Sequence, residues 1–283
     1  TLNDLGYQVN SRADLSLRNA WYAVGIGNKP DLYEPVCGKI RSAETWYNGT
    51  VTVPVTGFFT DNDPIGPLPE SYVLVDCASD TKISTLEYFE PMNGTVPMWD
   101  TEPDGIFSYL NNGNLSKSAV GIHTFSTTSA KWFKDKLNHI GLDNAGTNQV
   151  VNIIGKTGIG EAQFNPIDHV YEYPVEGAYS EIDAVTQTYF LGINNYLKQD
   201  PNVTQDYAHP EWEALRNGLA QIFAVNIKNE YKKALDPQYQ PVWTLYEDMA
   251  NSPNQFSFAT PKLKLKPALY KGDYWSDIYP ATN

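Results

Sequence analysis

The pattern of apolar and polar residues changes near Gly177. Before this point the apolar residues alternate with polar ones or stand in short blocks, which Gly, Pro, Asn and Asp separate. Such a pattern is typical of β-strands, and it predicts a strand-rich part over about 20–175. The polar residues 1–19 precede this part and are expected to form an N-terminal arm.

Two long stretches with helical spacing follow the strand-rich part. The first predicted helix covers 180–199, where Ser180 can cap the N-terminus and Pro201 ends the pattern. The second covers 210–235 and begins with proline, which is favoured at the first helical position. Its apolar residues are concentrated in the first half, so its N-terminal turns are predicted to be the more buried ones.

A third helix is predicted to be short, with Thr127 or Thr128 as its cap and Gly141 at its end. Strands in one part of the chain and helices in the other indicate an α+β protein. We therefore predict a single compact domain over 1–283, in which the two long helices pack on the sheet. Residues 176–283 would supply the helical part and a C-terminal tail.

Composition and charge limit the possible partners. The chain has 283 residues, of which 41% are hydrophobic, so it can form a large core. No run of apolar residues is long enough to predict a membrane span. The net charge of −13 repels phosphate groups, and nucleic acid is therefore not expected as a partner.

Cysteines and glycosylation sequons bear on the compartment. Cys37 and Cys77 both lie in apolar, strand-like segments, and we predict a disulfide between them, with two buried free thiols as the alternative. Asn-x-Ser/Thr sequons stand in segments rich in Gly, Pro or Asn, where a glycan could be solvated. The predicted glycosylation sites are Asn48, Asn93, Asn114 and Asn202. Together these features favour an extracellular protein.

The strongest candidate for chemistry is Trp99 with the two acids that follow it, Asp100 and Glu102. A Trp ring can stack on a sugar, while two carboxyl groups in different surroundings can act as acid and base. We predict Asp100 and Glu102 as catalytic residues and Trp99 as a substrate-binding residue. The alternative is an exposed hairpin tip with one packed Trp.

A second candidate lies in the predicted strand Ile167–Tyr173. Strand alternation places His169 and Tyr171 on one face, and we predict that both bind substrate. Asp168 and Glu172 fall on the other face, about 13 Å apart along the backbone, which is too far for an acid pair. A half-buried structural histidine is the alternative interpretation of His169.

The acidic loop after residue 60 offers two candidate metal ligands, Asp61 and Asp63. Asp61-Asn62-Asp63 matches the start of an EF-hand loop, but Ile65 and Tyr72 stand where further ligands are required. Calcium bound by Asp61 and Asp63 in another loop geometry is therefore the one possible cofactor.

Two functions from different classes are compatible with these features. The first is an extracellular acidic protein that binds or hydrolyses carbohydrate, and whether it is an enzyme stays open. The second is a structural subunit of an assembly, such as a virion or an extracellular filament, whose partners are copies of itself.

Overall fold

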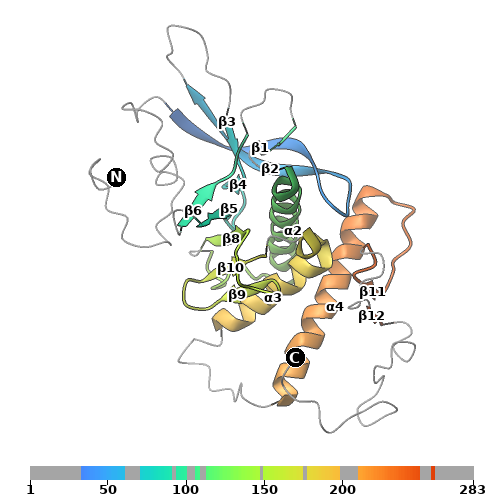
Figure 1. The fold of residues 1–283 in the computed structure, drawn as a ribbon. Helices are drawn as coiled ribbons and strands as arrows, with labels where there is room; N and C mark the ends of the chain where they lie inside the picture. Colours follow the sequence, from blue (N-terminus) through green and yellow to red (C-terminus); the bar gives the residue numbers. More distant parts are fainter. Residues whose placement is uncertain are drawn as a thin grey trace.

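The computed structural model describes residues 33–60, 71–90, 94–100, 106–108, 113–146, 149–174, 177–197, 210–248 and 256–258. Strands and helices are both present, and three helices pack beside two larger sheets (Figure 1). The predicted α+β class is therefore confirmed. In the described part of the chain, no helix combines the length and the apolar character that crossing a membrane requires.

The first sheet has four strands in the order β1-β2-β3-β7, and every neighbouring pair is antiparallel. The pairing of β1 with β2 shifts its register between Val36 and Lys39, where Gly38 adopts a positive φ of 74°. The strands are β1 (Tyr33–Glu44), β2 (Thr50–Thr60), β3 (Ser71–Val73) and β7 (Trp99–Asp100).

The second sheet has six strands and mixes both directions. Its order is β4-β5-β8-β10-β9, with β6 paired to β5, and β8 is parallel to both of its neighbours. All five residues of β8 are buried, as expected for a parallel strand covered on both faces. The strands are β4 (Val75–Asp76), β5 (Ile83–Phe89), β6 (Gly94–Pro97), β8 (Val150–Ile154), β9 (Gln163–Asn165) and β10 (Val170–Glu172). A small third sheet pairs β11 (Thr244–Leu245) with β12 (Phe256–Ser257).

The helices that follow Gly177 lie close to their predicted positions. A 3-10 turn, η5 (Gly177–Ser180), leads into α3 (Ile182–Leu197), and α4 (Pro210–Leu235) has its predicted bounds. Side chains of α3 belong to the main hydrophobic core together with strands of both larger sheets, so the prediction that helices pack on the sheet is confirmed.

The predicted short helix is wrong in length, because α2 runs from Gly113 to Leu137. Its first half is rich in Ser, Thr and Gly, which are weak helix formers in isolation. Tertiary contacts compensate for this weakness. The His123 ring nitrogens lie 2.9 Å from the Thr85 hydroxyl of β5 and 3.1 Å from the Pro54 carbonyl oxygen of β2. The helix thus lies centrally, in contact with both sheets (Figure 1).

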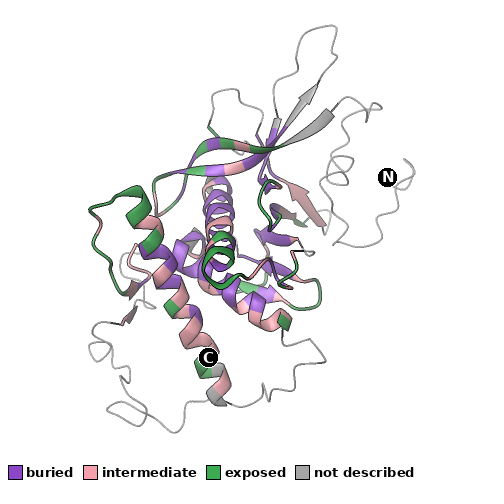
Figure 2. Cartoon of the chain, turned by 180° about the vertical axis from the view of Figure 1, so that it is seen from behind, coloured by how far each residue is buried: buried purple, intermediate pink, exposed green. Residues whose placement is uncertain are grey.

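The predicted burial of α4 is also wrong, because the second half of the helix is more buried than the first. In the first half, Leu215 and Ile222 remain 53% and 44% exposed. The side chains buried further along are Ala224, Val225, Ile227, Lys228 and Asn229. Figure 2 shows the first turns of α4 in pink and green and its middle in purple. The cause is tertiary, since the 244–248 segment packs against the later turns.

A disulfide joins Cys37 of β1 to Cys77, which directly follows β4. The prediction of this bridge is confirmed, and its Cα atoms are 5.4 Å apart. Because β1 and β4 belong to different sheets, the bridge links the two sheets covalently.

Candidate functional site

The predicted catalytic residue Asp100 has an internal partner. Its carboxylate lies 3.2 Å from the Arg41 guanidinium, and the two side chains are 0% and 4% exposed. The same guanidinium lies 4.0 Å from the centre of the Tyr72 ring and donates a hydrogen bond to the Ile106 carbonyl oxygen. Glu102 and the side chain of Trp99 fall outside the described residues, so the Asp100–Glu102 pair stays a prediction.

A polar group forms instead at the edge of the six-stranded sheet, around Asn165 at the end of β9. The Asn165 side-chain oxygen accepts hydrogen bonds from the backbone N–H groups of Ile167 and Asp168. These bonds fix the turn between β9 and β10. The Asn165 amide nitrogen donates to Asp168 Oδ2 and to Glu172 Oε1, each at 3.2 Å.

The expectation that Asp168 and Glu172 lie too far apart is therefore wrong, because both carboxylates bind one amide nitrogen. The reason is local: β10 begins at Val170, so Asp168 lies in the turn and the extended spacing of a strand does not apply to it. His169 has a φ of 55°, a left-handed conformation that is uncommon for a residue other than glycine.

Glu172 is held by three neighbours and is almost fully buried. Gln163 donates a 3.0 Å hydrogen bond to its Oε2, and Lys156 Nζ lies 3.3 Å from its Oε1. Burial would raise the pKa of Glu172, but the hydrogen bonds from Gln163 and Asn165 and the charge of Lys156 lower it. We call the group Lys156, Gln163, Asn165, Asp168 and Glu172 the edge cluster.

The predicted substrate-binding residues His169 and Tyr171 lie beside the edge cluster. The His169 ring is half-buried, stacks at 6.5 Å on Phe164 and meets the Tyr196 ring edge-on at 5.0 Å. Tyr171 is fully buried, and its hydroxyl donates to the Tyr189 carbonyl oxygen at 2.9 Å. Burial raises the pKa of Tyr171 well above its ordinary value. Tyr171 is thus packed against α3, and a substrate contact by either residue stays a prediction.

The predicted metal ligands Asp61 and Asp63 lie outside the described residues. Within the described ranges, no group of three or more His, Cys, Asp and Glu side chains could hold a metal ion. Calcium therefore stays a prediction.

Two of the four sequon asparagines lie in described segments. Asn48 is half-buried in the turn between β1 and β2, and its side-chain nitrogen donates to Asp248 Oδ2 at 3.3 Å. Asn114 stands in the first turn of α2, so its expected place in a loop is wrong. Asn93 and Asn202 lie outside the described residues.

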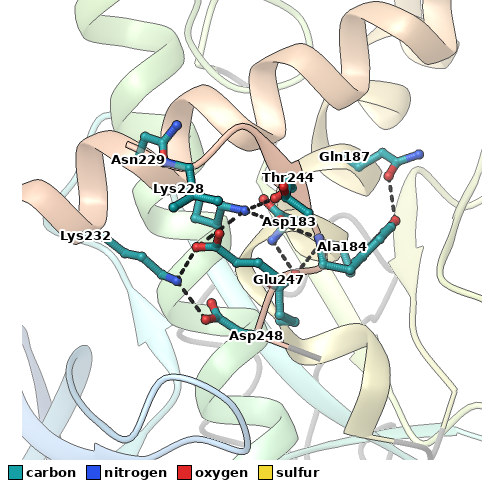
Figure 3. A network of polar contacts seen from close by, with 12 residues as sticks. Asp183, Ala184, Gln187, Lys228, Asn229, Lys232, Thr244, Glu247 and Asp248 are labelled. Atoms are coloured by element: carbon teal, nitrogen blue, oxygen red, sulfur yellow. Dashed lines mark hydrogen bonds and ion pairs between the residues drawn. The ribbon is translucent and has the colours of Figure 1, made fainter. Parts of the chain in front are cut away.

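A second polar group, buried more deeply, joins α3, α4 and the segment 244–248 (Figure 3). We call it the charge cluster, and its charged members are Glu181, Asp183, Lys228, Lys232, Glu247 and Asp248. The sequence gives one signal of it, which is Lys228 directly after Ile227 in the segment Ala224–Lys228 of α4.

Glu181 caps the N-terminus of α3, where Ser180 was the expected cap. Its Oε2 accepts hydrogen bonds from the backbone N–H groups of Asp183 at 2.8 Å and Ala184 at 3.3 Å. The glutamate side chain thus does what a shorter capping residue does at other helices. Its second oxygen, Oε1, is buried and has no hydrogen-bond partner among the described residues.

Lys228 is the centre of the charge cluster and is fully buried. Its ammonium donates to Asp183 Oδ2 at 2.9 Å and to the Thr244 carbonyl oxygen, and it lies 3.8 Å from Glu247 Oε1. An ammonium has three N–H donors, and two of them are used in these hydrogen bonds, while Glu247 adds an ion pair at longer range. Lys228 is therefore suited to hold α3 and the 244–248 segment together, rather than to attack a substrate.

Burial shifts the pKa values of two carboxyl groups in the charge cluster. Burial raises the pKa of Asp183 to about 6, although the ion pair with Lys228 acts in the opposite direction. Burial and the neighbouring Asp183 raise the pKa of Glu181 well above its ordinary value. Nearer the surface, Lys232 forms 2.7 Å ion pairs with both Glu247 and Asp248.

Comparisons with known proteins do not add to these observations. No family model matches the chain. No curated protein matches it either.

Proposed function

We propose that the protein is an extracellular carbohydrate-binding protein and that the edge cluster forms part of its binding surface. The observation that supports this proposal most directly is the arrangement around Asn165, where amides and carboxylates are fixed together at one sheet edge. Sugar hydroxyls donate and accept hydrogen bonds, so they suit a surface that offers both kinds of partner.

The exposure of the edge cluster fits a binding role. Gln163 and Asp168 are exposed, while Glu172 lies beneath them and holds Gln163 and Asn165 in place. The disulfide supports the extracellular part of the proposal, since such bridges persist in oxidising compartments.

We propose binding without hydrolysis at this surface. A glycosidase needs one carboxyl group that stays protonated to donate to the leaving oxygen. In the edge cluster the pKa of Glu172 is lowered, so this group is an ionised acceptor. The Asp100 carboxylate is paired with Arg41 and lies away from solvent, where a sugar cannot reach it.

Binding can be tested on a glycan array, followed by calorimetry with the best ligand. Gln163→Ala and Asp168→Asn should each weaken binding by about tenfold, which corresponds to the loss of one good polar contact. The control is Gln238→Ala, because Gln238 is also exposed but lies in the turn after α4. Unchanged affinity in both cluster variants, or no glycan bound by the parent protein, would contradict the proposal. Release of new reducing ends would contradict the absence of hydrolysis.

A second candidate function is a subunit of an assembly, and one observation favours it. Leu215 and Ile222 lie two turns apart on α4, so they share one side of the helix, and each exposes close to half of its surface. Exposed apolar side chains in such an arrangement are common at contacts between subunits.

A further inference from the structure

The charge cluster contains more acids than bases. Four carboxyl groups stand against two ammonium groups, and the members at its centre, Glu181, Asp183 and Lys228, are fully buried. If every group were ionised, two negative charges would have no counterpart within the cluster. Buried uncompensated charge is costly, so the protein has to remove part of it.

Glu181 is the member whose charge is least compensated. The ammonium of Lys228 is already engaged by Asp183, Thr244 and Glu247. Among the described residues, the donors to Glu181 are two backbone N–H groups of α3, and both bind Oε2. Its Oε1 has no hydrogen-bond partner in the described part of the chain, and a proton can be placed there without breaking any of these bonds.

We propose that Glu181 is held as a neutral carboxylic acid and that its ionisation loosens the 244–248 segment from α3 and α4. The segment then acts as a clasp that is closed while Glu181 carries its proton. This inference concerns the charge cluster alone and does not depend on carbohydrate binding.

The surroundings of Glu181 explain why its ionisation would act on this segment. Asp183 lies beside it on α3, and the segment itself carries Glu247 and Asp248, so a new negative charge meets acids on two sides. Lys228 is the one nearby cation of α4 that acts on Glu181. The titratable groups that face this region from other elements are Tyr47 of the β1–β2 turn, Tyr179 of η5, Tyr246 and Glu161.

The contacts that would be lost are well defined. The backbone N–H of Tyr246 donates to Asp183 Oδ2 at 2.7 Å, and the Tyr246 hydroxyl donates to Gln187. Asp248 also accepts a hydrogen bond from Asn48, so movement of the segment would free the turn between β1 and β2. Opening would let water reach Glu181, and this gain offsets the lost contacts once the carboxylate is charged.

The direction of the pH effect follows from linkage. Burial raises the pKa of Glu181 in the closed form, whereas in an open, hydrated form the pKa returns towards its ordinary value. The closed form therefore binds the proton more tightly. Acid favours the closed clasp, and opening is favoured as the pH rises through the raised pKa.

Hydrogen exchange of the intact protein, followed by mass spectrometry between pH 5 and pH 9, tests the clasp. After correction for intrinsic exchange rates, protection of residues 244–248 should fall by up to about tenfold per pH unit as the pH rises from the ordinary carboxyl pKa towards the raised pKa of Glu181. Above the raised pKa the protection should level off, because Glu181 is then ionised in both forms. Glu181→Gln keeps the capping oxygen and is neutral at every pH, so the fall in protection that Glu181 causes should be absent. A change that remains near pH 6 belongs to Asp183, whose pKa of about 6 lies in the same range. Glu230→Gln is the control, because Glu230 is paired with Lys136 at the surface and lies outside the charge cluster.

Two results would overturn the proposal. One is protection of 244–248 in the parent protein that does not depend on pH, and the other is equal pH dependence in Glu181→Gln. If that variant does not fold, infrared spectroscopy of the parent protein gives the answer. A carboxylic-acid C=O band that persists at pH 7 supports the neutral acid, and its absence overturns it.

Discussion

The carboxylate of Asp100 and the guanidinium of Arg41 form an ion pair with almost no access to water, at 0% and 4% exposure. Removing one partner leaves the other charge buried without compensation. We therefore expect Asp100→Ala to lower the free energy of unfolding by about 3–5 kcal/mol, measured by urea denaturation. The control is Glu44→Ala, because the Glu44–Lys117 pair is exposed and should leave the urea midpoint unchanged. A loss below about 1 kcal/mol for Asp100→Ala would contradict the assigned structural role.

The same residue shows how far the candidate site could be predicted from the sequence. An acid next to Trp99 signals a surface site, but nothing local shows that Arg41, fifty-nine positions earlier, meets Asp100 across the sheet. The edge cluster was hidden for another reason. The extended spacing of a strand separated Asp168 from Glu172 along the backbone, and only the turn at His169 brings both to Asn165.

At the scale of elements, α3 and α4 were predictable because both have caps or prolines at their starts and a clear apolar period. The length of α2 was not, since its Ser- and Thr-rich half becomes helical through contacts with residues such as Thr85 and Pro54. The buried half of α4 was not predictable either. What covers a helix depends on distant segments, here 244–248, and not on its own sequence.

The packing of α3 against β10 leads to a prediction about glycine. A Cβ added to Gly192 would lie 2.3 Å from the Tyr171 ring, so Gly192→Ala should push the helix off the strand. We expect a loss of about 1–3 kcal/mol in thermal or urea unfolding, despite the better helix propensity of alanine. Gly218→Ala in α4 is the matched control, because its Cβ would meet nothing within 4 Å. The free energy of unfolding of that variant should rise by up to about 1 kcal/mol. An equal change in stability in the two variants would contradict the proposed contact between Gly192 and Tyr171.

At the scale of the whole molecule, the exposed side chains of α4 bear on self-association. Leu215 and Ile222 are 53% and 44% exposed. If the protein is a subunit, sedimentation velocity should show association that rises with concentration, and the double variant Leu215→Ser/Ile222→Ser should remain monomeric. Leu235→Ser is a suitable control, because Leu235 is 67% exposed but lies at the other end of the helix. A parent protein that stays monomeric at every concentration would exclude this function.

The disulfide and the six-stranded sheet also differ in when they can form during synthesis. Cys37 and Cys77 are the two cysteines of the chain, and both precede β5. In contrast, β5 pairs in parallel with β8, so Ile83 can pair only after Val150 has been synthesised. The residues of α2 are synthesised between these two strands. A chain emerging from the ribosome N-terminus first can thus close its bridge, without a competing cysteine, before its six-stranded sheet exists. If the disulfide forms first, the parallel pairing of β5 with β8 then takes place in a chain that is already constrained.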